Sequence, residues 1–314
     1  MLHGLARAHP ETRFEWWYRP HRYFRARGED RPANVRRRLL FPSADLFHGM
    51  NQRLPRKRMR RAVATFHDLF VMTGEYSTAE FRARFTEQAR DAAARADAII
   101  TVSAFTKSQV VDLLGVPAER VRVVHHGSLW PASGERAQGG RLVLHVGAIQ
   151  KRKNIVRLVE AFETLDASWR LALAGSAGFG AEEIFARIER SPARARIDVL
   201  GYVPAAKLRE LYRQAGIFAF PSLDEGFGIP VVEAMAAGVP VVTSNRSALP
   251  EVAGDAALLV DPEDTEALAH GLRELAANAD LRRELVRRGL ERARNFSWEK
   301  AAQETWQVYC ELVG

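Results

Sequence analysis

The chain has 314 residues, 47% hydrophobic and 27% charged, so it can form one large or two medium globular domains. Its single cysteine, Cys310, excludes an internal disulfide framework and a cysteine-based metal site. No run of about 18 apolar residues indicates a membrane span, and the N-terminus shows no basic-then-apolar leader. We therefore expect a cytoplasmic protein.

The net charge of +8 is unevenly spread. The segment from Arg19 to Arg61 holds 14 Arg or Lys residues and three acids. This pattern is compatible with a solvated basic face, or with attraction to an anionic lipid surface at about 1 kcal/mol per basic residue. Nucleic-acid binding would need a recognisable module or interleaved aromatic residues, and the aromatic run from Phe14 to Tyr18 reads better as a strand end. We expect no nucleic-acid partner, and a peripheral position at the inner face of the membrane stays open.

Strands and helices alternate through the first half. The chain begins with the tail of a helix from Leu2 to His9, followed by the strand-like run from Phe14 to Tyr18. A loop with one polar helix is expected from His21 to Arg38. Buried strands are predicted at Ala62 to Phe66 and Ala98 to Val102, a short strand at Asp45 to His48, and the last strand of this half at Val121 to Val124. Helices are predicted at Ala79 to Ala96 and from the cap Ser103 to Leu114, with Gly115 ending the second.

The composition from Leu129 to Gly140 changes to that of a linker, and the alternation then restarts. Strands are predicted at Leu142 to Gly147, Arg170 to Ala174, Ile197 to Leu200, Ile217 to Phe220, Val239 to Thr243 and Ala257 to Val260. The pattern predicts an α/β fold of two Rossmann-like, doubly wound domains facing each other across a cleft. We expect one domain over residues 1–130, a second over 131–297, and a separate terminal helix over 298–314.

The stretch from Gly216 to Ser244 carries the clearest chemistry. Gly226 and Gly228 flank Phe227 just before a helix that opens at Pro230, so backbone N–H groups there can approach an anion. Glu225 and Glu233 stand eight positions apart and can face one crevice at the carboxyl ends of the strands. Alternatively, Glu233 only complements the helix dipole and Glu225 is a solvated acid of the loop.

The pattern Pro-Ser-x-x-Glu-Gly-Phe-Gly-x-Pro-x-x-Glu-Ala-Met-Ala-x-Gly-x-Pro-Val runs without a gap from Pro221 to Val241. It resembles the signature of the retaining nucleotide-sugar glycosyltransferases of family 4, the group 1 type with the GT-B fold. The resemblance implies that Glu225 holds donor-sugar hydroxyls and that Glu233 holds the ribose. It also implies that the amides of Gly226 to Gly228 meet sugar and phosphate, and that the terminal helix crosses back onto the first domain.

A basic turn, Gly147-Ala-Ile-Gln-Lys-Arg-Lys-Asn154, lies between a predicted strand and helix. Arg152 and Lys153 suit a diphosphate, Arg by its fork geometry and Lys as a point charge; an exposed basic turn is the alternative. The segment resembles the phosphate-gripping element of the same family. Relatives often carry Arg or Thr directly after the glycine, where this chain has Ala148, so one phosphate contact is expected to be absent. Val203, in the turn after another strand, joins the expected donor-binding residues.

Several residues of the first half also resemble family positions. His67, at the end of a buried strand, resembles the histidine beside the donor sugar, and Asp68 would orient it. A surface or core histidine is the alternative, and His48 occupies a similar position. The other matches to family segments are Ser103, Thr106, Lys107, and the inter-domain edge at His125, His126 and Gly127.

The resemblance implies transfer of a sugar from a nucleoside diphosphate sugar to a saccharide or lipid-linked acceptor hydroxyl, with retention of configuration. No Asp-x-Asp sequence occurs, so we expect no metal and no other cofactor, with Arg152, Lys153 and the helix N-terminus neutralising the phosphates. Relatives begin with a strand and a glycine-rich loop followed by a long helix, and the first residues of this sequence resemble that helix. We therefore expect a truncated N-terminal domain without the first strand and loop. A nucleotide-sugar-binding protein with impaired or no transferase activity is therefore the alternative. A GT-B epimerase would need an acid–base set that is not apparent.

Overall fold

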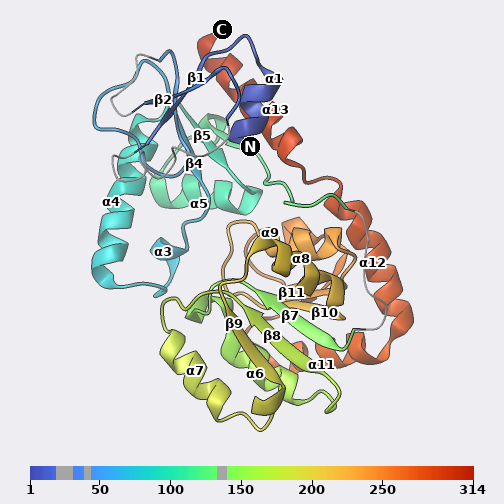
Figure 1. Cartoon of the computed structure of the whole chain (residues 1–314). Coiled ribbons are helices and arrows are strands. Elements are labelled where there is room, and N and C mark those ends of the chain that lie inside the picture. Colours follow the sequence, from blue (N-terminus) through green and yellow to red (C-terminus); the bar gives the residue numbers. More distant parts are fainter. Residues whose placement is uncertain (19–30, 39–43, 133–139) are drawn as a thin grey trace.

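The computed structural model describes residues 1–18, 31–38, 44–132 and 140–314. Within these ranges the chain forms an N-terminal and a C-terminal half, each built around a sheet of parallel strands with helices packed on it (Figure 1). No helix of the described residues is long and apolar enough to cross a membrane. The C-terminal helix runs from the second half back to the first, so the two halves are joined twice.

A four-stranded parallel sheet forms the centre of the N-terminal half, with its strands side by side in sequence order. The strands are β3 (Phe47–Gly49), β4 (Ala62–Phe66), β5 (Ala98–Thr101) and β6 (Val121–Val123). The helices are α3 (Phe70–Thr73), α4 (Ala79–Arg95), α5 (Ala104–Leu114) and the 3₁₀ turn η2 (Ala118–Arg120). All of β4 and β5 is buried, as expected for parallel strands covered on both faces. The α5 boundaries confirm the prediction, since Ser103 caps the helix and Gly115 ends it at φ 64°.

The first residues add a small two-stranded sheet to this half. Helix α1 (Leu2–Ala8) leads into β1 (Phe14–Trp17), which pairs in parallel with β2 (Val35–Arg38). The expected loop and polar helix from His21 to Arg38 is wrong at its C-terminal end, where β2 lies. Residues 21–30 of that segment lie outside the described residues. Only Val35 of β2 is buried, so the strand leaves no apolar periodicity in the sequence; its backbone pairing with β1 defines it.

A six-stranded parallel sheet forms the centre of the C-terminal half. Its strands are β7 (Leu142–Val146), β8 (Arg170–Ala174), β9 (Ile197–Gly201), β10 (Ile217–Phe220), β11 (Val241–Ser244) and β12 (Ala257–Val260). They lie in the order β9-β8-β7-β10-β11-β12. This is the strand order of a doubly wound Rossmann sheet, in which the direction of winding reverses between the first and fourth strands, here β7 and β10.

Helices cover both faces of the six-stranded sheet. They are α6 (Ile155–Glu163), α7 (Ala181–Glu189), α8 (Ala205–Gln214), α9 (Ile229–Ala236), α10 (Leu249–Ala253), α11 (Thr265–Ala277), α12 (Ala279–Ala293) and the 3₁₀ turns η3 (Lys151–Lys153) and η4 (Arg194–Arg196). One apolar cluster joins the sheet to α8 and α9 through Tyr212, Phe218 and Val232. A second joins the other face to α6 and α11 through Phe162, Leu171 and Leu272.

The last helix, α13 (Trp298–Val313), packs on the N-terminal half. Its Ala301 and Val308 lie in one apolar cluster with Val63 and Ile100 of the four-stranded sheet. Its Tyr309 hydroxyl hydrogen-bonds to Nδ1 of the half-buried His48 at 2.5 Å. Figure 1 shows this helix beside α1, so both ends of the chain lie on the N-terminal half.

Candidate functional site

The direction of winding reverses between β7 and β10, and open α/β sheets bind ligands beyond the carboxyl ends of the strands at such a point. Two loops meet there. One follows β7 from Gly147 to Asn154, and the other follows β10 from Pro221 to Gly228. The connection is direct, because the Leu223 N–H donates to the Arg152 carbonyl at 2.9 Å. Both sequence-predicted motifs therefore lie in one place.

Three charged side chains meet at this point, and each residue is 7–8% exposed. Arg152 Nη1 lies 2.9 Å from Glu225 Oε1, and Lys153 Nζ contacts the same oxygen. Arg152 also donates to the Asp224 carbonyl. The aromatic ring of Phe220 lies under Lys153, with 4.6 Å between the ammonium and the ring centroid. The three predicted donor-site residues Arg152, Lys153 and Glu225 thus form one buried cluster.

The electrostatics of the cluster favour an ionised carboxylate. Burial alone would raise the pKa of Glu225, but the charges of Lys153 and Arg152 outweigh it and lower this pKa to about 2. Burial lowers the pKa of Lys153, and the charge of Glu225 opposes that shift. Two bases thus contact one carboxylate oxygen, and the carboxyl groups of Asp68 and Asp224 lie close enough to interact with the charge of Arg152. An anion that displaced Glu225 would find both bases available as donors.

Glycines let the loops approach each other and the other half. A Cβ on Gly226 would lie 1.8 Å from the His67 carbonyl oxygen of the N-terminal half, so only glycine fits there. Gly228 has φ 107° and precedes α9, where any side chain would be strained. Gly147, at φ 154°, packs against the Lys153 side chain. Phe227 is 4% exposed, and its ring packs edge-on against His126 and Phe296.

The second acid, Glu233, lies inside α9 and is 4% exposed. The Tyr212 hydroxyl of α8 donates to Glu233 Oε2 at 3.0 Å. Burial raises the pKa of Glu233 to about 7, against the smaller opposing effect of that hydrogen bond. Trp130, from the segment between the halves, packs edge-on against the Tyr212 ring with 5.6 Å between centroids. Val203 packs at the border of the same apolar cluster.

His145, in β7, was not predicted from the sequence. It is fully buried, stacks on Phe220 at 5.6 Å and contacts the Ala219 carbonyl through Nδ1 at 3.0 Å. That contact makes Nδ1 the donor, and Nε2 has no hydrogen-bond partner among the described residues. Burial lowers the pKa of His145 to about 4, so the ring is neutral. A histidine inside an apolar strand run gave no signal that it would lie beneath Lys153.

His67 lies where β4 ends, next to the loop that carries Gly226. Its Nδ1 lies 3.1 Å from His126 Nε2, and its Nε2 lies 2.8 Å from the Met50 carbonyl. The expectation that Asp68 orients this ring is wrong, because both ring nitrogens are occupied by these other partners. Burial instead raises the pKa of Asp68 to about 6. His48 bonds to Thr65 at 2.7 Å and to Tyr309, which fits an anchor for α13.

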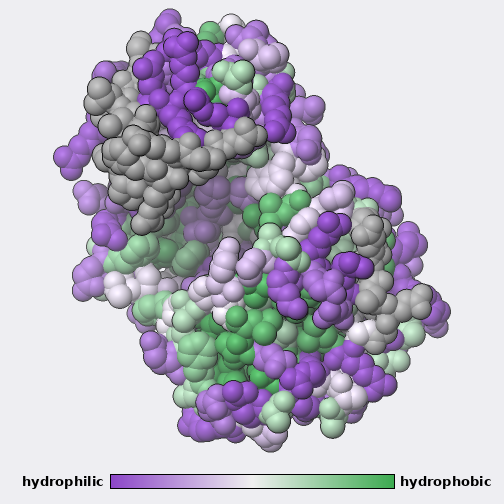
Figure 2. Space-filling model, viewed as in Figure 1, coloured by the Kyte–Doolittle hydropathy of each residue, from purple (hydrophilic) through white to green (hydrophobic). Residues whose placement is uncertain are grey.

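The two halves meet around the charged cluster. The Phe70 ring of α3 stacks over the Arg152 guanidinium at 4.1 Å, and the Thr73 hydroxyl donates to Asp224 Oδ2 at 3.0 Å. Lys107, one of the residues matched to the family, donates instead to the Val121 carbonyl at 2.9 Å. Figure 2 shows the surface hollowed between the upper and lower parts of the molecule. Within the described residues, no group of three His, Cys, Asp or Glu side chains could hold a metal ion.

Comparison with known proteins identifies the family. The model of the glycosyl transferases group 1 matches residues 129–292, and that of glycosyltransferase family 4 matches residues 3–128. The O-antigen chain mannosyltransferase B of Escherichia coli is 35% identical over 283 residues, which cover 84% of this chain and 74% of that protein.

Among solved structures, the sucrose-phosphate synthase of Thermosynechococcus elongatus matches with a TM-score of 0.71 at 26% identity. The match covers 81% of this chain and 68% of that protein's chain. HepE of Anabaena, solved in complex with UDP and glucose, matches with a TM-score of 0.69 at 19% identity. This match covers 80% of this chain and 72% of the HepE chain. Because the two family models together span both halves and a mannosyltransferase of this type is 35% identical, this chain belongs to the group 1, family 4 glycosyltransferases, and its fold is the GT-B fold of its solved relatives.

Proposed function

We propose that the protein transfers a sugar from a nucleoside diphosphate sugar to an acceptor hydroxyl, with retention of the anomeric configuration. The observation that carries this proposal is the buried cluster of Arg152, Lys153 and Glu225 at the switch point of the Rossmann sheet. Two bases that share one acid suit a diphosphate, whose charge grows as the sugar departs. HepE, which has the same fold, was solved with UDP and glucose.

The donor's contacts follow from the positions of the two acids. Phosphate oxygens would bind Arg152 and Lys153 in place of Glu225. Glu225 Oε1 could then accept hydrogen bonds from the sugar hydroxyls. Glu233 lies one turn into the following helix, where its carboxylate would accept from the ribose hydroxyls. The amides of Gly226, Phe227 and Gly228 at the start of α9 would add the favourable end of the helix dipole. No step of this scheme requires a metal.

Retention would follow a same-face course. The departing phosphate would accept the proton of the incoming hydroxyl, while the protein stabilises the diphosphate and the oxocarbenium-like sugar. In this scheme His67 lies on the acceptor side of the sugar, with its ring held by His126 and the Met50 carbonyl. No carboxylate nucleophile of the kind used by retaining glycosidases is part of the scheme.

The acceptor would be a saccharide or a lipid-linked saccharide. The basic residues from Arg19 to Arg61 support a peripheral position on an anionic membrane surface at the cytoplasmic side. Of these, Arg56, Lys57 and Arg58 are exposed, whereas residues 19–30 and 39–43 lie outside the described residues. No nucleic acid is included among the proposed partners.

The test is a thermal-shift screen of UDP-, GDP- and ADP-sugars, followed by a transfer and hydrolysis assay with the donor that binds. We expect one donor class to raise the melting temperature, and the anomeric proton of the product to show retention by NMR. Lys153→Met and Glu225→Gln should lower turnover by about 100-fold or more. A wild-type chain that binds a donor but neither transfers nor hydrolyses its sugar would instead support a binding protein. A product of inverted configuration would contradict the stereochemical part of the proposal.

A further inference from the structure

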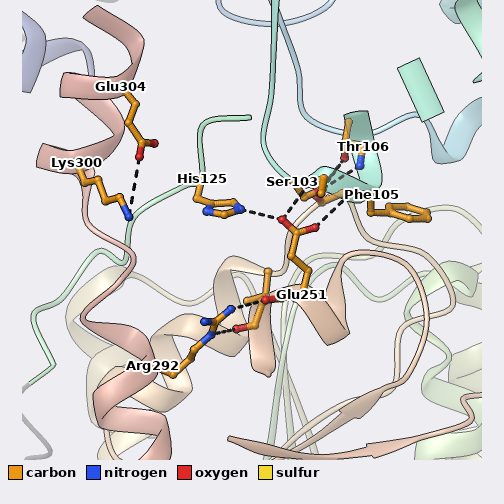
Figure 3. Close-up of polar contacts among 11 residues, drawn as sticks. Ser103, Phe105, Thr106, His125, Glu251, Arg292, Lys300 and Glu304 are labelled. Carbon is orange, nitrogen blue, oxygen red and sulfur yellow. Dashed lines mark hydrogen bonds and ion pairs between the residues drawn. The ribbon is translucent and has the colours of Figure 1, made fainter. Parts of the chain in front are cut away.

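Glu251, on α10 of the C-terminal half, hydrogen-bonds to two separate elements of the N-terminal half (Figure 3). Its Oε1 accepts from the Ala104 N–H at 2.9 Å, and its Oε2 accepts from the Phe105 N–H at 3.2 Å. His125 Nε2, just beyond β6, lies 2.8 Å from the same Oε1. One carboxylate therefore ties α10 both to the start of α5 and to the exit of β6.

Helix α5 consequently has two N-terminal caps from opposite halves. Ser103 Oγ accepts from the Thr106 N–H at 2.9 Å, which is the ordinary cap from within the helix. Glu251 takes the N–H groups of the first two helical residues, which have no partner within a helix. A negative charge at this end also complements the dipole of the helix.

The Glu251 carboxylate is suited to remain charged. Its side chain is 25% exposed. Burial alone would raise its pKa, but the hydrogen bonds from His125, Ala104 and Phe105 hold the pKa below its ordinary value. The backbone of α10 is held in place as well, because Arg292 of α12 donates to the Val252 carbonyl at 3.0 Å and to the Glu251 carbonyl at 2.5 Å.

The same contact region holds the loop that carries Glu225. The Gly226 carbonyl accepts from Ser103 Oγ at 2.7 Å and from Thr106 Oγ1 at 3.1 Å, both at the start of α5. On the other side, the Glu225 N–H donates to Ser247 Oγ at 3.0 Å, and the Glu225 carbonyl accepts from the Ala248 N–H at 3.2 Å. Ser247 and Ala248 lead directly into α10. The backbone of Glu225 and Gly226 is thus held between α5 and α10, the two helices that Glu251 joins.

We propose that Glu251 is a positioning residue, which latches the two halves together at the N-terminus of α5 and thereby holds the Glu225 loop in place. Without this carboxylate, α10 and α5 lose their direct polar connection, and the halves separate more widely and more often. The latching does not depend on the proposed function; the effect on turnover does.

The first measurement is the distance between the two halves, obtained by single-molecule Förster resonance energy transfer in the absence of any ligand. Cys310 is the chain's single cysteine, is exposed, and lies on α13 against the N-terminal half. A second label on α7 is provided by Glu183→Cys, at an exposed position of the C-terminal half. In this background Glu251→Ala should lengthen and broaden the distance distribution, and Glu251→Gln should do so less because its amide keeps one acceptor oxygen. Glu182→Ala, on the exposed face of α7, is the matched control and should leave the distribution unchanged.

Ala104→Pro tests the latch from the other side. Proline is favoured at the first helical position and removes the N–H that bonds to Glu251 Oε1, while the preceding Ser103 already has an extended backbone. It should lengthen the same distance with the helix content retained in the circular dichroism spectrum. Combined with Glu251→Ala, it should add little, since the bond that proline removes is already lost in that variant. Distributions that match the wild type in both folded single variants would overturn the proposal.

Turnover is the second measurement. Glu251→Ala should lower kcat/KM by about tenfold or more, while the affinity for the nucleoside diphosphate alone changes by about twofold or less, because the proposed nucleotide contacts lie on one half. Equal losses in nucleotide affinity and in turnover would contradict a positioning role. If no nucleotide bound the wild type, the proposed function would fail while the distance measurement would still decide the latch.

Discussion

At the scale of single residues, the site depends on buried groups whose charge is set by their neighbours. Glu225 is held ionised by two bases, whereas Glu233 has one hydrogen-bond donor, Tyr212, and a pKa raised by burial to about 7. The pKa values of the two acids of one motif are therefore shifted in opposite directions. The two acids were readable from the sequence, but the bond from Tyr212 to Glu233 and the buried His145 beside Phe220 were not, because these contacts join segments distant in the chain.

Nucleotide affinity should therefore depend on pH through Glu233. Its folded-state pKa lies above the unfolded value of 4.5, so its contribution to stability is complete below pH 4.5 and is lost as the pH rises through about 7. Ribose hydroxyls need the ionised form as acceptor, so binding should tighten by about tenfold between pH 6 and pH 8. Calorimetry of the wild type and of Glu233→Gln across this range is the measurement. A variant that kept the full pH dependence would show that another group is responsible.

The charged cluster should show strong coupling in its stability. Lys153→Met leaves Glu225 with Arg152 alone in a buried site, which should cost about 2 kcal/mol of unfolding free energy. The double variant Lys153→Met, Glu225→Gln should be at least as stable as Lys153→Met alone, although both should be inactive. Denaturant titration of the four proteins of this cycle gives the coupling energy. Simple additivity would mean that the pair does not interact.

At the scale of elements, the segment from Ile217 to Ser244 was predicted well because each part has a local cause. The apolar run gives β10 over Ile217–Phe220, and Pro230 lies in the first turn of α9. Strand β2 was missed because its polar side chains hide a backbone pairing, and the role of Glu251 was missed because capping usually comes from the same chain segment. Contacts between distant elements leave no period in the sequence.

Gly226→Ala tests the close approach of the two halves. The new Cβ would lie 1.8 Å from the His67 carbonyl oxygen, and the neighbour is backbone, so the loop and β4 must move apart. We expect a loss of turnover of about 100-fold and a small fall in melting temperature, because the strain can be relieved by separating the halves. Gly4→Ala is the matched control, because its new Cβ would lie 3.5 Å from the Ala302 Cβ, an ordinary contact. A variant with normal turnover would contradict the arrangement of this loop.

At the scale of the whole molecule, the halves are joined by the connection before β7, by the polar contacts around Gly226, and by α13. The last of these combines the Tyr309–His48 hydrogen bond with an apolar contact, in which Val308 is 3% exposed and packs with Val63 and Ile100. The helix therefore belongs to the packing of the N-terminal half although it ends the sequence. The sequence predicted the helix itself, while its partner surface followed from the family resemblance.

Val308→Asp should destabilise the N-terminal half by about 3 kcal/mol or more, since it buries an unpaired charge. Val313→Asp, at a 51% exposed position of the same helix, is the matched control and should change stability by less than about 0.5 kcal/mol. Thermal unfolding monitored by circular dichroism compares the two. Equal melting temperatures would mean that α13 does not contribute to the core.

Trp130 offers an optical consequence of the packing between the connecting segment and the C-terminal half. Its indole lies against Tyr212, whose hydroxyl holds the acid proposed for the ribose. Occupation of that acid by a nucleotide would shift the phenol ring and with it the surroundings of the indole. The tryptophan fluorescence of the unlabelled protein should then change on nucleotide binding. Trp130→Phe should remove most of this fluorescence change without lowering the affinity for the nucleotide.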